Sequence, residues 1–143
     1  MIVKNILAGK GGNAITINPT ADVIAAVKLM AERGIGAVVV LGADHRIVGI
    51  LSERDIVQAL AEHGAAVLSE PVSQVMTREV KSCSENDTME DLMGRMTTGR
   101  FRHLPVVQQD KLIGIVSIGD VVKNRVEEIG HETKALHDYI QTA

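Results

Sequence analysis

The first half of the chain carries an apolar pattern that predicts a helix set between short strands. The helix is indicated by apolar residues at i, i+3, i+4 and i+7, namely Val23, Ala26, Val27 and Met30. Gly34 follows, where glycine commonly ends a helix. Apolar runs at 14–17, 37–41 and 47–51 predict strands, and a second helix is predicted at 53–62. The order of elements is β-α-β-β-α.

The same pattern occurs again in the second half of the chain. The stretch from Gly49 to Val57 recurs as Gly114 to Val122 at a shift of 65 residues, and earlier elements align at a shift of 66. This recurrence predicts strands at 80–83, 103–107 and 112–116, a helix that Gly99 stops, and a last helix at 119–128. The apolar face of the first of these helices would consist of Met89, Leu92, Met93 and Met96.

We therefore predict an α+β fold made of two α/β-type repeats, residues 1–67 and 68–143. One repeat of about fifty residues would be a marginal domain, so the two are expected to pack together. A linker at 64–76 would join them. The tail beyond 128 keeps apolar residues at helical spacing, so we expect it to continue the last helix with a bend near Gly130. It would pack on the N-terminal segment or on another subunit.

Composition and charge narrow the classes of partner. The chain has 143 residues, a net charge of −3, one Phe, one Tyr and no Trp, which argues against a basic or ring-stacking surface for nucleic acids. Its single cysteine excludes an intrachain disulfide, and no apolar run has the length of a membrane span. We therefore expect a cytoplasmic protein with neither nucleic-acid nor membrane partners.

A Ser-x-x-Asp motif stands at the predicted strand-to-helix junction of both repeats, as Ser52 with Asp55 and Ser117 with Asp120. One interpretation is structural: the serine caps the helix and the aspartate reaches back, as in a capping box. The other is functional, because free amides and a hydroxyl at a helix N-terminus suit a phosphate, and a carboxylate can accept both hydroxyls of a ribose. An aspartate on the first turn can serve both purposes.

The two repeats differ at the start of their central strands. Arg102 and His103 stand where the first repeat has Gly36 and Ala37. Arginine supplies a fork matched to phosphate, and the small residues opposite would leave room for a base or a ribose. Arg54 opposes the dipole of its helix, a conflict that a bound anion would remove. The alternative for these residues is an ordinary surface or partly buried role.

The sequence contains no arrangement typical of a catalytic or metal site. Cys83 falls in a predicted strand and is expected in the core, and the histidines lack the spacing of a metal site or a triad. The segment 9–13, Gly-Lys-Gly-Gly-Asn, lacks the spacing of a nucleotide-hydrolysing phosphate loop. We expect it to be a flexible entry loop with Lys10 available to a ligand.

With these motifs the chain resembles a tandem pair of cystathionine β-synthase (CBS) domains over residues 14–130. The resemblance rests on four segments: 101–107, 114–120, Ser52 to Asp55, and 75–77. It implies a pseudo-twofold disc, a Bateman module, with two clefts. In this family such clefts bind adenosine compounds: AMP, ADP, ATP, S-adenosylmethionine or NAD(H).

The resemblance also implies which residues would line each cleft. One cleft would combine Ile15, Gly36 and Ala37 with Arg102, His103, Ile115, Ser117 and Asp120. The other would combine Thr77, Val80, Lys81 and Arg102 with Ile50, Ser52, Arg54 and Asp55. The two aspartates would bind riboses and the basic residues phosphates. Because the first repeat lacks a basic or histidine-containing pair at 36–37, the clefts should differ in affinity or ligand.

Together these features predict a non-catalytic adenine-nucleotide sensor that binds AMP, NAD(H) or ATP and needs no cofactor for catalysis. It would form a homodimer and dock on an unidentified protein partner. Two alternatives are a purely structural dimerisation module, in which the clefts stay empty, and a nucleotide-processing enzyme, which would turn its ligand over.

Overall fold

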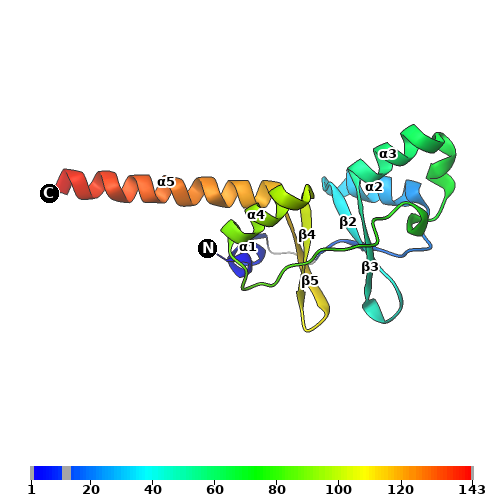
Figure 1. Cartoon of the computed structure of the whole chain (residues 1–143), viewed down its shortest axis with the longest axis horizontal. Helices are drawn as coiled ribbons and strands as arrows, with labels where there is room; N and C mark the ends of the chain where they lie inside the picture. Colours follow the sequence, from blue (N-terminus) through cyan, green and yellow to red (C-terminus); the bar gives the residue numbers. More distant parts are fainter. Residues whose placement is uncertain (1, 11–13, 143) are drawn as a thin grey trace.

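The computed structural model describes residues 2–10 and 14–142, and it divides into two similar halves. The first half contains β1 (Thr16–Ile17), α2 (Val23–Arg33), β2 (Ala37–Leu41), β3 (Ile47–Ser52) and α3 (Glu53–His63). The second half contains α4 (Met89–Gly99), β4 (His103–Gln108), β5 (Lys111–Ser117) and α5 (Ile118–Thr142). Figure 1 shows the two halves side by side, with the short helix α1 (Val3–Lys10) against the second.

Each half forms a small sheet of its own. In the first half the strand order is β1-β2-β3, with β1 parallel and β3 antiparallel to β2. In the second half β4 and β5 pair antiparallel, and the strand predicted at 80–83 is reduced to one bridge between Cys83 and Val106. Both hairpins shift register at the equivalent place, after Val40 and after Val106. The structure thus confirms the duplication.

The first helix of each repeat ends in a left-handed residue, but the two residues differ. α2 ends at Gly34 as predicted, with φ 63° and ψ 38°. α4 continues through Gly99, and Arg100 adopts the left-handed conformation with φ 57° and ψ 33°. The prediction that Gly99 stops this helix is therefore wrong by one residue. Gly99 is needed for another reason, because a Cβ there would collide with the ring of Phe101, which packs against the second core.

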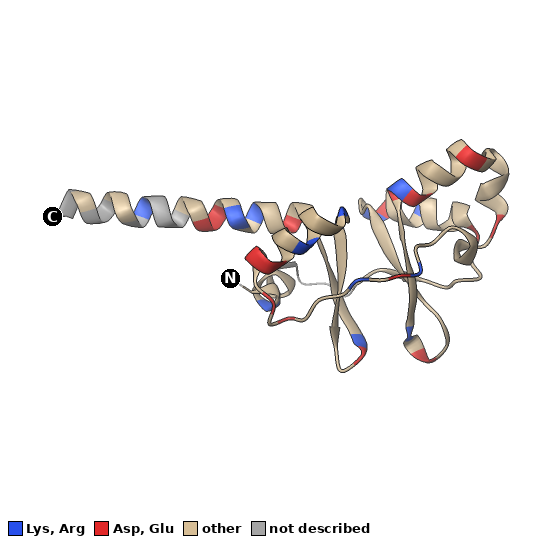
Figure 2. Cartoon of the chain, viewed as in Figure 1, with Lys and Arg blue, Asp and Glu red and all other residues tan. Residues whose placement is uncertain are grey.

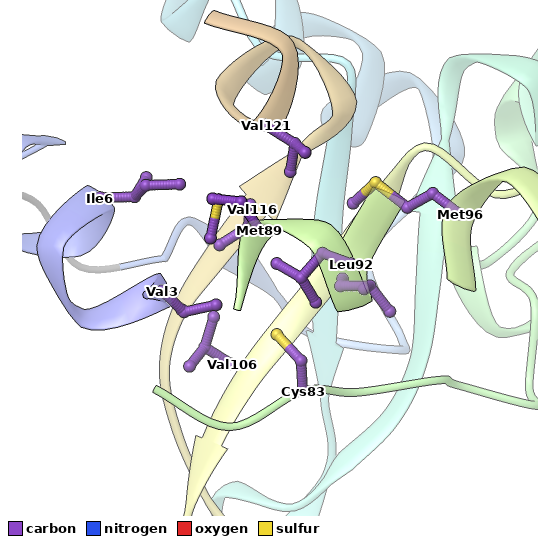
Figure 3. Packing of buried hydrophobic residues seen from close by; sticks show 10 residues of the cluster. Val3, Ile6, Cys83, Met89, Leu92, Met96, Val106, Val116 and Val121 are labelled. Carbon is purple, nitrogen blue, oxygen red and sulfur yellow. The ribbon is translucent and has the colours of Figure 1, made fainter. Parts of the chain in front are cut away.

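The core of the second half includes a helix from the opposite end of the chain. Val3 and Ile6 of α1 are buried among the apolar residues of α4, β4 and β5, as Figure 3 shows. The first amides of α1 are also anchored there, since the Val3 N–H donates to the Asp87 carbonyl at 2.9 Å. The N-terminal segment therefore packs with the second repeat, although it directly precedes the first.

The linker completes the core of the first half in the same way. It is not a loose connection but forms two 3-10 turns, η2 (Ala65–Ser69) and η3 (Val72–Gln74). Val72 and Met76 are buried with α2, β2 and β3, and the Val72 N–H donates to the Ala21 carbonyl at 2.7 Å. Each half thus depends on the segment that leads into the other half.

Two buried glycines permit this exchange. A Cβ added to Gly49 would lie 2.5 Å from the sulfur of Met76 and 2.9 Å from the Thr77 carbonyl oxygen. A Cβ added to Gly114, the equivalent residue of the second half, would lie 2.6 Å from a methyl of Leu7. Glycine lets the crossing segment approach the strand this closely.

The core contains only aliphatic and sulfur-containing side chains, apart from the partly buried Phe101. Cys83 is buried as predicted, and burial raises the pKa of its thiol to about 11. Met89, Leu92 and Met96 of α4 are also buried, but Met93 is 37% exposed, so its predicted place in the core is wrong. The spacing identified the correct helix face, and Met93 lies at its edge.

The last helix differs from the prediction in its course. α5 is a single helix of 25 residues that passes through Gly130 without a break. Only its beginning packs on the body, through the buried Val121, and Figure 1 shows the remainder extending away from both halves. The predicted continuation of the helix is confirmed, whereas the bend near Gly130 is wrong. The expected packing of the tail on the N-terminal segment does not occur for its exposed residues Val126, Ile129, Leu136 and Ile140.

We predict that Gly49→Ala lowers the free energy of unfolding by about 1–3 kcal/mol, because the added methyl displaces Met76 and presses on backbone that cannot move aside. Chemical denaturation measures this. Gly94→Ala is the matched control: nothing lies within 4 Å of a Cβ at this position in α4, so the change should stabilise the helix by up to about 1 kcal/mol. Equal effects of the two substitutions would contradict the close approach.

Candidate ligand-binding site

The start of α3 is held by a complete capping box. The Ser52 N–H donates to Oδ2 of Asp55 at 2.9 Å, and the Asp55 N–H donates to Oγ of Ser52 at 3.2 Å. The other carboxylate oxygen of Asp55 accepts a hydrogen bond from the Thr77 hydroxyl at 3.1 Å. The structural interpretation of the motif is therefore confirmed, and Asp55 is fixed in one orientation at the helix start.

The start of α5 repeats this geometry in the second half. The Ser117 N–H donates to Oδ2 of Asp120 at 2.9 Å, and the Asp120 N–H donates to Oγ of Ser117 at 3.1 Å. The N–H of the first helical residue is also engaged in both halves: Glu53 donates to the Gly36 carbonyl and Ile118 to the Arg102 carbonyl. The free amides expected at these helix starts are thus reduced, since the first and third helical N–H groups already have partners.

The two helix starts face one cavity that both halves line. It has a volume of about 1320 Å³ and gathers residues expected in both clefts. Fourteen of the predicted residues line it: Ile15, Gly36, Ala37, Ile50, Ser52, Arg54, Asp55, Thr77, Lys81, Arg102, His103, Ile115, Ser117 and Asp120. Small-molecule sites commonly occupy about 300–1,000 Å³, so this cavity has room for an elongated ligand or for more than one.

Two predicted residues are not among those that line the cavity. Val80 is half-buried, and its neighbours Glu79 and Lys81 line the cavity instead. Lys10 is the last residue of α1, not part of a loop, and its side chain lies outside the described residues. Of the expected entry loop, residues 11–13 also lie outside them.

The space opposite Gly36 is used differently from the prediction. A Cβ added to Gly36 would lie 3.4 Å from Nε2 of His103 and 3.6 Å from the carboxyl carbon of Glu53. Gly36 therefore borders the imidazole of His103 from the second half, on the side where we expected a base or a ribose. Ala37 is 3% exposed, so its side chain belongs mainly to the core. His103 and Glu53 therefore both lie beside Gly36.

Several residues that line the cavity were not predicted from the sequence. Among them are Leu7 from α1, Phe101, Glu53 and a further basic residue, Arg100. Leu7 could not be assigned because only the chain path brings α1 to the second half. Arg100 did carry a signal, because at a shift of 66 residues it occupies the place of Gly34.

The charges around the cavity are mixed. Arg54, Lys81, Arg100 and Arg102 line it together with the acidic Glu53 and Glu79 and the two capping aspartates. Both carboxylates of the capping aspartates already accept hydrogen bonds, whereas in the described part of the chain no ion pair involves Arg100 or Arg102. Figure 2 shows blue and red residues interspersed along the ribbon of both halves.

Among the side chains that the structure describes, there is no cluster of three or more His, Cys, Asp or Glu residues that could hold a metal ion. In the same described residues, no helix is both long and apolar enough to cross a membrane.

Comparison with known families agrees with this architecture. The family model of the CBS domain matches the chain twice, at residues 7–62 and 72–127, and the chain therefore belongs to the CBS domain family. The matched segments contain both sheets and both helix starts that line the cavity.

Similar proteins share this pair of domains. A CBS-domain containing protein from Agrobacterium tumefaciens, ATU1752, has a solved structure with 47% sequence identity and a TM-score of 0.84, and the match covers 87% of this chain and 92% of that one. The mitochondrial CBS domain-containing protein CBSX3 of Arabidopsis thaliana is 34% identical in a match that covers 97% of this chain. The chain spans 71% of that relative and 64% of a 17.7 kDa protein from Acidianus ambivalens.

Two more distant solved structures share the fold and contain ligands. The CBS domain protein PAE2072 from Pyrobaculum aerophilum, complexed with AMP, is 24% identical with a TM-score of 0.75, and the match covers 84% of this chain and 89% of that one. The CBS domain pair of protein MJ0100, in complex with 5-methylthioadenosine and S-adenosyl-L-methionine, is 23% identical with a TM-score of 0.80 over 90% of this chain and 98% of that one.

We predict that Ser117→Ala lowers the free energy of unfolding by about 1 kcal/mol, because the Asp120 N–H loses its acceptor at the helix start. Thermal or urea denaturation tests this. Ser69→Ala, an exposed serine in η2 outside the cavity, is the control and should change stability by less than about 0.5 kcal/mol. An unchanged stability of Ser117→Ala would show that the capping box contributes little.

Proposed function

We propose that this chain is a regulatory module that binds an adenine nucleotide between its two repeats and catalyses no reaction. The observation that carries the proposal is the shared cavity, which residues of both halves line and into which both Ser-x-x-Asp helix starts face. A ligand there touches both repeats at once. It can therefore favour one relative orientation of the halves over another, provided that it binds the two arrangements with different affinity.

The chemistry of the lining supports a nucleotide. Asp55 and Asp120 are held in fixed orientations by their caps, which suits hydrogen bonds to ribose hydroxyls. Arginines and a lysine nearby suit phosphate groups. Ile15, Ile50 and Ile115 offer aliphatic walls for an adenine in a chain that has almost no aromatic residues.

The related structures favour adenosine compounds as the class of ligand. AMP occupies one solved CBS protein, and 5-methylthioadenosine and S-adenosyl-L-methionine occupy another. For this chain we propose AMP, ATP or NAD(H), because each combines a ribose with the phosphate groups that the basic residues would bind.

We expect AMP, ATP or NADH to raise the melting temperature of ligand-free protein by several degrees. A ligand at one hundred times its Kd stabilises the folded state by about 2.7 kcal/mol. The double variant Asp55→Asn with Asp120→Asn keeps a capping acceptor but loses both ribose carboxylates, so the shift should largely disappear. Calorimetric titration of the same proteins gives the affinities.

Asp44→Asn is the control for this experiment, because Asp44 lies in the exposed turn η1 (Ala43–His45) and does not line the cavity. It should leave the ligand-induced shift unchanged. No shift with any of the three nucleotides at millimolar concentration would contradict the proposed function. Conversion of the nucleotide during incubation, detected by chromatography, would favour the enzymatic alternative.

We also propose that the chain pairs with a second copy of itself through α5. Five residues of this helix, exposed by 47–64%, follow one another at intervals of 4, 3, 7 and 4: Val122, Val126, Ile129, Leu136 and Ile140. This is the heptad spacing of a coiled coil, in which each such residue packs against the equivalent residues of a partner helix. A helix that extends from the body also gains most of its stability from packing such a face.

The pairing predicts that Val126→Asp shifts the protein from dimer to monomer, because the carboxylate would be buried in the apolar stripe of the partner helix. Light scattering coupled to size-exclusion chromatography measures the mass over a range of concentrations. Lys134→Asp places an acidic residue on the same helix outside the stripe and should leave the mass unchanged. A wild-type protein that is monomeric at high micromolar concentration would contradict the pairing.

A further inference from the structure

Arg100 occupies an unusual backbone conformation for its residue type. Among the described residues, five besides glycine have a positive φ, and four of them form the two hairpin turns: Asp44, His45, Gln109 and Asp110. Arg100 is the fifth and follows the last residue of α4. In the left-handed region the Cβ of an L-residue crowds the backbone, so glycine is preferred at this position after a helix.

The duplication provides a direct comparison. The equivalent residue of the first repeat is Gly34, with φ 63° and ψ 38° against 57° and 33° for Arg100. Both residues line the same cavity. The backbone geometry is thus the same in both repeats, and only the second repeat places a strained arginine there.

The surrounding contacts hold Arg100 at the cavity. Phe101 packs against the second core, and Gly99 leaves room for its ring. The carbonyl of Arg102 accepts the Ile118 N–H at 2.7 Å, which ties the segment to the start of α5. Arg100 and Arg102 therefore border the cavity from a segment that is anchored at Phe101 and Arg102, where the first repeat has Gly34 and Gly36.

We propose that Arg100 binds a phosphate group and that, with Arg102, it makes the cavity select nucleotides with two or more phosphates over adenosine and AMP. This rests on the proposed nucleotide-binding function. Two guanidinium groups two residues apart provide more donors than one phosphate needs. A ligand with a second phosphate, such as ADP, ATP or NAD(H), would bind both guanidinium groups, whereas adenosine would bind neither. Strained residues are typical of functional sites, where a specific side chain is required despite its backbone cost.

The experiment compares Arg100→Gly with the wild type by titration calorimetry and thermal denaturation, using adenosine, AMP, ADP and ATP. For the wild type we expect affinity to rise from adenosine to ATP. Arg100→Gly should raise the melting temperature of ligand-free protein by about 2–4 °C, because it removes the strain. It should also weaken ATP binding by about ten-fold or more, and leave adenosine binding unchanged.

Two further variants separate charge from backbone. Arg100→Lys keeps a positive charge and the strained backbone, so its loss of ATP affinity should be smaller than that of Arg100→Gly. Arg33→Gln removes an exposed arginine at the end of the equivalent helix, outside the cavity, and should change neither stability nor binding.

The outcomes distinguish this proposal from the proposed function. If the wild type binds none of the four compounds and NADH gives no thermal shift either, the proposed function itself fails. If it binds them and Arg100→Gly retains wild-type affinity for ATP, the role of Arg100 is wrong while nucleotide binding stands. Equal affinity of the wild type for adenosine and ATP would likewise overturn the selection of phosphates.

Discussion

The two halves depend on a reciprocal exchange of apolar side chains. Val3 and Ile6 of the N-terminal helix are buried in the second half, and Val72 and Met76 of the linker are buried in the first. Neither half can therefore bury its core with its own β-α-β-β-α unit alone. A half-size unit of this kind is marginal by itself, and the exchange couples the stability of one half to the position of the other. Because the cavity lies between the two halves, the same coupling affects the cavity.

Much of the fold could be predicted because it follows from local patterns in the sequence. Apolar spacing identified the principal helices and all five strands of the described residues, and the Ser-x-x-Asp motif identified both helix starts. The crossing of α1 into the second half has no local signal, since Val3 and Ile6 would look equally apolar in either core. The edge strand at 80–83 and the course of α5 beyond Gly130 also depend on what packs nearby.

The residues that line the candidate site were predicted better than the contacts that these residues make. Fourteen residues expected at two clefts line one cavity, because the duplication places equivalent elements around a common boundary. The Ser-x-x-Asp spacing predicted the capping hydrogen bonds, but the contacts with residues far away in the sequence could not be predicted from it. The Asp55 carboxylate is already shared between Ser52 and Thr77, and the room expected beside Gly36 contains His103. A ligand must therefore compete with these contacts or fit around them.

A duplicated protein that binds one asymmetric ligand needs its two copies to differ at the cavity. Two of these differences stand where Gly34 and Gly36 of the first repeat are replaced by Arg100 and Arg102 in the second. The backbone does not require an arginine at position 100, because glycine adopts the same conformation at position 34. A nucleotide has a charged end and an apolar end. Its polarity matches the difference at these two places, where the second repeat supplies guanidinium groups and the first supplies small residues, while Arg54 of the first repeat lines the cavity elsewhere.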